Sequence, residues 1–216
     1  MSAAIPETSA AAMGRHPRRR QADRSAAMRL QLVEATVASL IEIGYARTTT
    51  VEICRRAGVT RGALLHHFDS LADLFAATLT RIYEGFLSGS AADDSPPING
   101  KTLVEGLWRH FSRPEYKAVI ELWLASRNEP ELGAVLQPTI ARIRDLASPG
   151  LNSDLRRRLG QSSDAVALYR LLLEAMIGMA LGRAVTPGGG IMGHEDQVVA
   201  LLGQVASGLL DPSSRG

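Results

Sequence analysis

Apolar residues recur at spacings of three and four along most of this chain, which is the period of helices that bury one face. The first stripe follows 23 residues without periodicity and consists of Leu30, Val33, Val37, Leu40 and Ile41. Gly44 comes soon after, and glycine readily adopts the left-handed conformation that ends helices. The pattern therefore predicts a flexible tail over residues 1–23 and then a long helix.

Two short helices with capping signals are predicted between residues 49 and 67. Thr49 can accept a hydrogen bond at the start of the first helix, and Glu52 can return one to the Thr49 amide. Gly58 ends this helix, and one residue separates it from the next cap, Thr60. Two short helices joined by a tight turn that contains glycine form a helix-turn-helix.

Helical periodicity continues through the rest of the chain, and no segment alternates convincingly as a strand would. Further helices are expected at residues 70–86, 102–111, 112–126, 128–146, 151–159, 163–185 and 191–210. The predicted fold class is therefore all-α, with an N-terminal three-helix domain and a larger helical body. The predicted boundaries are 1–23 for the tail, 24–69 for the helix-turn-helix domain and 70–210 for the body.

Composition narrows the class of protein. The chain is 45% hydrophobic but only 5% aromatic, so its core is built mainly from aliphatic residues. No apolar run approaches the roughly 20 residues of a membrane span, and residues 1–13 lack the charged start and apolar centre of a secretory signal. The one cysteine, Cys54, cannot form an internal disulfide and is expected to be a small buried residue. We therefore expect a cytoplasmic protein.

Positive charge is concentrated near the N-terminus. Residues 15–68 contain ten arginines and four acidic residues, a net charge of +6, whereas the whole chain carries only +2. A basic region on a nearly neutral body is suited to a polyanion such as DNA. A solvated charged surface would have the same composition, so charge alone leaves both interpretations open.

The sequence around the two short helices closely resembles the DNA-binding domain of the tetracycline-repressor (TetR) family. The resemblance covers residues 24–75 and is carried by Gly44-Tyr45, Thr48-Thr49-Thr50, Ile53, Ala57-Gly58-Val59-Thr60-Arg61-Gly62, Leu64 and His66-His67-Phe68. It implies a C-terminal ligand-binding and dimerisation domain, and a homodimer on a palindromic double-stranded DNA operator. The implied function is a ligand-responsive, sequence-specific transcriptional regulator, typically a repressor released by a small-molecule effector.

The DNA contacts that the resemblance implies fall on Thr49, Thr60, Arg61, Gly62, Ala63, His66 and His67. We expect the two threonines to bind phosphates and Arg61 to read a base, because a guanidinium can make two hydrogen bonds to guanine. Gly62 lets the helix approach the DNA closely, and Ala63 can touch a thymine methyl. The two histidines either meet phosphate or pack behind the helix.

Two positions depart from the family's pattern. Leu65 stands where a tyrosine commonly binds phosphate, and Leu71 stands where a lysine commonly begins the next helix. Either the affinity for DNA is lower, or other groups compensate. Arg55 and Arg56 could add nonspecific attraction. The cluster Arg18-Arg19-Arg20 could follow the minor groove as a basic arm, or it is a solubility tail.

No metal site, cofactor or catalytic centre is expected. His66 and His67 are adjacent on a helix, so their side chains point about 100° apart and seldom share one ion. No nucleophile, base and orienting group form a recognisable set, so the chain is not expected to be an enzyme. Two alternatives to a DNA-binding regulator remain: a ligand-binding module that has lost DNA binding, and an enzyme with a helical active site.

The candidate effector-binding residues are aromatic residues of the helical body, Trp108, Phe111 and Trp123. Further candidates for the wall of such a cavity are Tyr116, Tyr169, Met176 and Met179, with His110, Glu121 and Arg127 as polar groups. Each of these residues could instead belong to a packed core.

The last two helices, at 163–185 and 191–210, are too apolar for the surface of a monomer. Across a two-fold axis they would form a four-helix bundle. The residues expected there are Leu168, Leu171, Leu172, Ala175, Met176, Met179, Ala180, Val198, Leu201, Leu202, Val205 and Leu209. A buried hairpin within one chain would use the same residues, and the symmetry of a palindromic operator favours the dimer.

Overall fold

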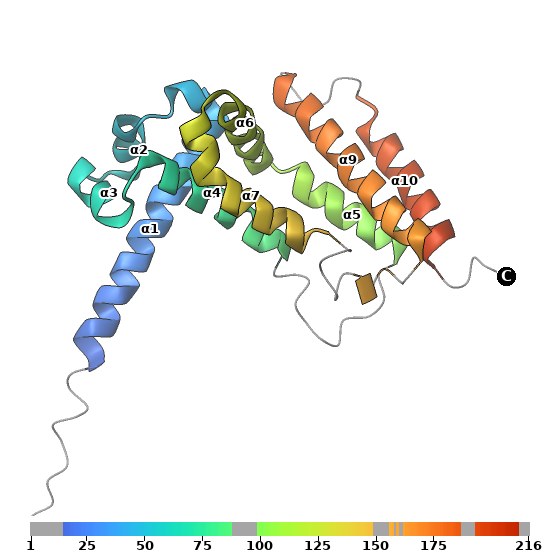
Figure 1. Cartoon of the computed structure of the whole chain (residues 1–216), viewed down its shortest axis with the longest axis horizontal. Coiled ribbons are helices and arrows are strands. Elements are labelled where there is room, and N and C mark those ends of the chain that lie inside the picture. Colours follow the sequence, from blue (N-terminus) through green and yellow to red (C-terminus); the bar gives the residue numbers. More distant parts are fainter. Residues whose placement is uncertain are drawn as a thin grey trace, which may run out of the picture.

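The computed structural model describes residues 15–87, 99–148, 156–157, 159, 162–186 and 193–211. The helices are α1 (Arg15–Ile43), α2 (Thr50–Ala57), α3 (Arg61–His67), α4 (Leu71–Leu87), α5 (Gly100–Phe111), α6 (Glu115–Asn128), α7 (Pro130–Leu146), α9 (Ser163–Val185) and α10 (Glu195–Leu210), with a 3-10 turn η1 (Tyr45–Arg47). These residues contain no strand, and the all-α fold class is confirmed. Helices α1 to α3 lie at one end of the molecule and α5, α9 and α10 at the other (Figure 1).

Helices α1 to α3 pack around a small hydrophobic core of their own. Its buried residues are Leu32, Val33, Ile53, Cys54, Ala57, Leu64, Phe68 and Leu74, the last of which lies on α4. Cys54 is therefore a buried core residue, and burial raises the pKa of its thiol. A buried thiol with a raised pKa lacks the thiolate character of a redox sensor.

The turn between α2 and α3 follows from three local signals. Thr49 and Thr60 have extended backbone conformations and accept hydrogen bonds from the amides of Glu52 and Ala63, as N-caps do. Gly58 has φ of 63°, in the left-handed region that glycine adopts without strain, and its amide bonds to the carbonyl of Arg55. These signals confirm the predicted helix pair, which runs from Thr50 to His67.

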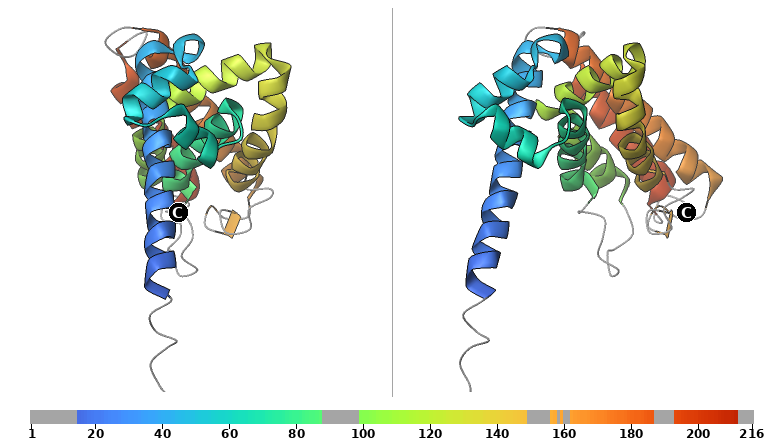
Figure 2. Two further views of the ribbon diagram at one scale, coloured as in Figure 1. Left: turned by 90° about the vertical axis from the view of Figure 1, so that its left-hand side faces the viewer. Right: turned by 60° about the vertical axis from the view of Figure 1, so that its left-hand side comes forward.

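Helix α1 begins earlier than the sequence predicts. Residues 15–23 were expected to be part of a flexible tail, but α1 is continuous from Arg15 to Ile43. Its N-terminal part extends beyond the rest of the molecule as a protruding rod (Figure 2). Side chains 21–27 are all exposed, so this part of the helix buries no apolar face that periodicity could reveal. The expected tail residues 1–14 lie outside the described residues.

The second core is larger and holds the helical body together. Helices α1, α4, α5, α6, α7, α9 and α10 contribute to it, with Tyr116, Leu122, Leu136, Leu172 and Met176 among its fully buried side chains. Gly100 begins α5 where α10 crosses, and a Cβ there would overlap the backbone of Ala206 and Ser207. The Asp211 carboxylate after α10 accepts hydrogen bonds from the Asn99 side chain at 2.9 Å and the Gly100 amide at 3.0 Å. The start of α5 is therefore bonded to the residue that follows α10.

The C-terminal helices match their predicted positions with small differences. Helix α9 covers the predicted range, whereas α10 begins at Glu195, four residues later than expected. The predicted helix at 151–159 lies mostly outside the described residues. By length and apolarity α9 could also cross a membrane, although 39% of its most apolar window is buried within the protein. It packs against α5, α6 and α10, which is also the behaviour of a core helix.

Candidate DNA-binding surface and effector site

Helix α3 buries one side and exposes the other. Leu64 and Phe68 are 1% and 3% exposed, and they fix the inner side in the small core. Each residue of an α-helix turns about 100° from the one before it. Arg61, Leu65, Gly62 and His66 therefore follow one another around the outer side, and all four are exposed. We call these four residues the outer arc of α3.

The two threonines that cap α2 and α3 are also exposed. The Thr49 hydroxyl oxygen accepts the Glu52 amide at 3.3 Å, and that of Thr60 accepts the Ala63 amide at 3.2 Å. Both threonines are exposed, and a hydroxyl that accepts one hydrogen bond can still donate another. Ala63 is only half-buried, and it lies on the opposite side of α3 from Leu65.

The expected return bond from Glu52 to the Thr49 amide is absent, and this prediction was wrong. The Thr49 amide bonds to the Arg47 carbonyl at 3.1 Å. Glu52 instead accepts hydrogen bonds from Arg55 at 2.7 and 2.8 Å and from Arg56 at 2.6 Å. These charged donors displace a neutral amide because charge-assisted hydrogen bonds are roughly twice as strong.

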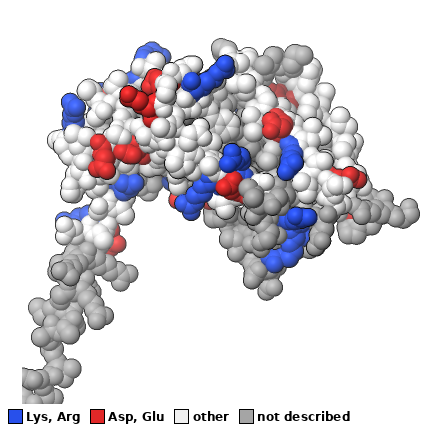
Figure 3. Space-filling view, viewed as in Figure 1, with Lys and Arg blue, Asp and Glu red and all other residues white. Residues whose placement is uncertain are grey.

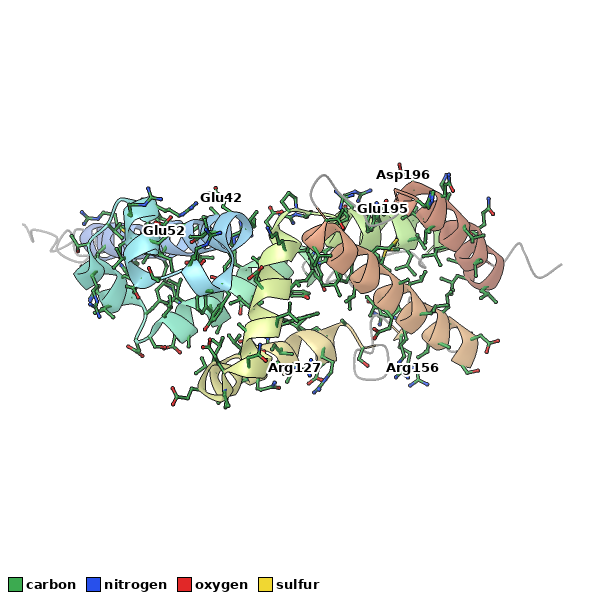
Figure 4. All side chains as sticks on the ribbon, turned by 90° about the horizontal axis from the view of Figure 1, so that it is seen from above. Glu42, Glu52, Arg127, Arg156, Glu195 and Asp196 are labelled. Carbon is green, nitrogen blue, oxygen red and sulfur yellow. The ribbon has the colours of Figure 1, made fainter. Side chains whose placement is uncertain are left out.

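The same ion pairs limit what Arg55 and Arg56 can offer to DNA. Arg56 also binds the Glu42 carboxylate of α1 at 2.7 Å, so two arginines face two carboxylates. Glu42 and Glu52 lie on neighbouring helices at this end of the molecule (Figure 4). The hydrogen bonds from Arg55 and Arg56 lower the pKa of Glu52 to about 2. Together, the two arginines and the two carboxylates carry no net charge. The nonspecific attraction for phosphate that was considered for Arg55 and Arg56 should therefore be small.

Two side chains of α1 hold the helix pair in place, and sequence patterns gave no sign of either. Arg29 donates to the His67 carbonyl at 2.7 Å and lies over the Phe68 ring at 4.2 Å from its centre. Gln31 donates to the Ala57 carbonyl at 2.7 Å, at the end of α2. His67 is half-buried and its ring meets that of His66 edge to face, whereas His66 is exposed.

The two departures from the family's pattern have different structural roles. Leu71 is half-buried and packs against both hydrophobic cores, so it joins the two halves of the molecule. Its replacement of a lysine exchanges a charge for a core contact. Leu65 is 49% exposed on the outer arc and has no such role.

The candidate effector residues all belong to the large core but meet different partners. Phe111 and Trp123 meet the ring of Tyr116 edge to face, at 4.7 and 6.1 Å between centres. Tyr83 of α4 and His110 of α5 complete this group, which we call the aromatic cluster. The ring of Trp108 lies beneath the guanidinium of Arg183 on α9 at 5.7 Å. Tyr83 was not foreseen, since it has the spacing of an ordinary core residue.

The aromatic cluster is uncharged at neutral pH. Burial raises the pKa of Tyr83 to about 12 and raises that of Tyr116 further. Burial, with the nearby charge of Arg113, lowers the pKa of His110 to about 4. The buried indole Nε1 of Trp123 makes no hydrogen bond to any described residue. The cluster therefore combines aromatic faces with an N–H group suited to an acceptor.

Helix α6 connects this cluster to the DNA-binding helices. Its Tyr116 and Trp123 lie in the cluster, and Lys117 donates to the Ile41 carbonyl at the end of α1 at 2.8 Å. Glu121 accepts the Tyr45 amide of η1 at 2.7 Å. Just after α6, Glu129 accepts the Tyr45 hydroxyl at 2.6 Å. Glu121, a candidate polar group of the effector site, therefore binds the start of η1.

Helices α9 and α10 leave large apolar side chains exposed. Leu171 and Leu201 are 57% and 60% exposed. The set, which we call the C-terminal apolar face, is Leu171, Leu181, Val185, Val198, Leu201, Val205 and Leu209. Few charged side chains lie over these two helices in the view of Figure 3. Of the other residues predicted for a dimer interface, Leu168, Leu172, Met176 and Ala180 are buried within the chain.

A helix-turn-helix unit attached to a helical body defines a class of DNA-binding regulator. Residues 32–78 match the sequence profile described as bacterial regulatory proteins of the tetR family, and residues 101–211 match that of the tetracyclin repressor-like C-terminal domain. The chain belongs to the TetR family. Its members are ligand-responsive, DNA-binding transcriptional regulators, typically repressors.

Individual relatives agree with this assignment. The HTH-type transcriptional regulator BetI 2 of Chromohalobacter salexigens is 31% identical over 175 residues, which cover 74% of this chain and 79% of that protein. An uncharacterised HTH-type transcriptional regulator of Mycobacterium bovis is 34% identical over 136 residues, 57% of this chain and 68% of that protein. These relatives are transcriptional regulators by name.

Solved structures share the fold. GusR of Salmonella enterica has a TM-score of 0.61 and 20% identity, covering 85% of this chain and 95% of that one. A transcriptional regulator from Saccharomonospora viridis, solved in complex with choline, has a TM-score of 0.59 and 16% identity, covering 83% and 95%. At these identities the likeness concerns the fold alone.

Proposed function

We propose that this protein is a cytoplasmic homodimeric repressor that binds a palindromic operator through α3 of each subunit and leaves it when a small molecule binds the helical body. The observation that carries the proposal is the C-terminal apolar face, which a monomer would leave in water. Burying a leucine side chain contributes about 1.5–3 kcal/mol relative to leaving it exposed. Two copies related by a two-fold axis would cover this face on both.

The outer arc of α3 supports the DNA-binding half of the proposal. Arg61 is exposed at the start of α3, and this exposure supports a role in reading a guanine from the major groove. Thr49 caps α2 and Thr60 caps α3, and both have hydroxyl groups that can donate to phosphate. His66 is exposed and can meet phosphate, whereas His67 is half-buried and its backbone carbonyl accepts a hydrogen bond from Arg29.

Dimerisation fixes the spacing of the two recognition helices. Half-sites of a palindromic operator lie about 34–36 Å apart, one turn of DNA, so both helices bind only at that separation. A four-helix bundle of α9 and α10 from two subunits would hold the DNA-binding ends at a defined distance. The C-terminal face and the outer arc therefore act together in operator binding.

Introducing a charge into the C-terminal apolar face tests the dimer. Leu201→Glu buries an unpaired carboxylate in the proposed interface, which should convert the dimer to a monomer in sedimentation equilibrium. The same variant should bind operator DNA at least tenfold more weakly, because a monomer engages one half-site. Leu124→Glu is the matched control, since Leu124 is 55% exposed on α6. A wild-type chain that sediments as a monomer would overturn the proposal.

The aromatic cluster is the proposed effector site. Phe111 and Trp123 supply apolar faces, and the Trp123 Nε1 offers a hydrogen bond that no described residue takes. Trp108 is not included, because its ring is already covered by Arg183. A ligand that separates these rings must displace α6, which carries both Tyr116 and Trp123.

Displacement of α6 reaches the DNA-binding helices through three hydrogen bonds. Lys117 and Glu121 hold the end of α1 and the start of η1, and Glu129 holds the Tyr45 hydroxyl. A ligand can shift the position of the DNA-binding domain only if it prefers one arrangement of α6. In this proposal the effector prefers an arrangement in which the two α3 helices no longer match the operator spacing.

A further inference from the structure

We propose that Leu65 is a second base-reading residue, which contacts the 5-methyl group of a thymine close to the guanine read by Arg61. The inference rests on the proposed docking of α3 in the major groove. It gives a specific role to a position where the sequence departs from the TetR family.

Leu65 lies in the middle of the outer arc. Around the helix it falls between Arg61 and Gly62, and its side chain is 49% exposed. Its neighbour Leu64 supplies the core contact of this turn, at 1% exposed. Leu65 is therefore not needed to hold α3 in place, and an apolar side chain there is free to meet a partner.

Gly62 leaves space next to Leu65 that the protein does not need. A Cβ at Gly62 would meet only the Thr60 hydroxyl oxygen, at 3.8 Å, and Gly62 does not have the positive φ that favours glycine. Glycine inside a helix is unfavourable relative to alanine, and packing among the described residues does not require glycine at this position. Side chains on a helix lean toward its N-terminus, so Leu65 leans toward this bare surface.

Thymine is the base that an exposed leucine side chain in the major groove should contact. An isobutyl group cannot bond to phosphate, and the apolar group that the major groove offers is the 5-methyl of thymine. Residues four apart on a helix are about 6 Å apart along its axis, and base pairs are about 3.4 Å apart along DNA. The thymine is therefore expected within two base pairs of the guanine that Arg61 reads.

The test removes the methyl group and nothing else. Random DNA duplexes are selected for binding to the full-length wild-type protein, and each thymine of the enriched site is then replaced by deoxyuridine. Loss of one buried methyl should weaken binding about fourfold at one thymine in each half-site. Leu65→Ala should bind the thymine and deoxyuridine duplexes equally at that position. Leu124→Ala, on α6, should keep the wild-type preference.

The outcomes separate this inference from the proposed function. If no sequence is enriched, both the reading of DNA by α3 and the role of Leu65 are wrong. If a site is enriched but no thymine near the guanine is sensitive to deoxyuridine, only the role of Leu65 is overturned. The same conclusion follows if the sensitivity is present and Leu65→Ala retains it. Equal thermal unfolding midpoints for Leu65→Ala and wild type show that folding is not the cause.

Discussion

At the scale of single residues, the DNA-binding end is characterised by exposed polar groups that can still bind a partner. Arg61 and His66 are exposed, and the hydroxyl groups of the two capping threonines can each donate one more hydrogen bond. Arg55 and Arg56 already pair with Glu42 and Glu52. These two arginines are therefore expected to add little to the affinity for phosphate.

Replacing Gly62 with alanine should stabilise the protein and weaken its binding to DNA. Gly62→Ala adds a Cβ in open space and improves helix propensity, so the free energy of unfolding should rise by about 0.5–1 kcal/mol. The same methyl would separate α3 from the groove, so affinity for the selected operator should fall. Denaturant unfolding and gel retardation measure the two effects. If Gly62→Ala binds as tightly as wild type, no close approach occurs at this position.

Glu52 should make the stability of the small DNA-binding domain depend on pH in the acid range. Its pKa is lowered from an ordinary 4.5 to about 2 by the hydrogen bonds from Arg55 and Arg56. Folding thus favours the carboxylate, so these ion pairs stabilise the domain above about pH 4.5 and cease to do so as the pH falls toward 2. Wild type should be more stable than Glu52→Gln at pH 6, and the difference should shrink by pH 3. A difference independent of pH would contradict the assignment.

At the scale of helices, local signals were predictable and long-range contacts were not. The caps at Thr49 and Thr60 and the turn at Gly58 depend on residues within four positions, so the sequence located α2 and α3 closely. The contact between Glu121 and Tyr45 joins residues that are 76 positions apart in the sequence, and no local pattern predicts it. The start of α1 was missed because its exposed residues 21–27 have no apolar period.

The effector site shows the same limit. Trp108, Phe111 and Trp123 were predicted as one group, and this stays a prediction. The rings of Phe111 and Trp123 meet Tyr116, whereas Trp108, one helical turn before Phe111, lies beneath the guanidinium of Arg183. Sequence spacing can place residues on one face of a helix, but it does not say which neighbour that face meets. Tyr83 was missed for this reason, because its partners lie on α5 and α6.

Helix α6 is the element whose role in coupling can be tested without knowing the effector. Glu121→Ala removes a charge-assisted hydrogen bond to the Tyr45 amide, worth about 1.5–3 kcal/mol. Hydrogen exchange at that amide should therefore accelerate at least tenfold, while amides in the middle of α9 keep their protection. Glu131→Ala, at an exposed position on α7, is the control. Unchanged exchange at Tyr45 would show that α6 does not hold η1.

At the scale of the whole molecule, the two ends have complementary tasks. The outer arc of α3 lies at one end and the C-terminal apolar face at the other, with α4 and α6 between them (Figure 1). Leu71 packs against both hydrophobic cores, so in the proposed mechanism a movement of the body would reach the DNA-binding helices by contact as well as by hydrogen bonds. Small shifts in packed elements are converted to discrete changes because cores do not deform continuously.

The central claim is that α3 reads DNA sequence, and Arg61 tests it most directly. Binding of wild type and Arg61→Ala to the selected operator is compared by gel retardation at fixed salt, with the exposed Arg127→Ala of α6 as the charge-matched control. We predict that Arg61→Ala loses about 1–3 kcal/mol per half-site and no longer distinguishes guanine at one position, while Arg127→Ala binds like wild type. Equal binding of Arg61→Ala and wild type to that operator would contradict the claim.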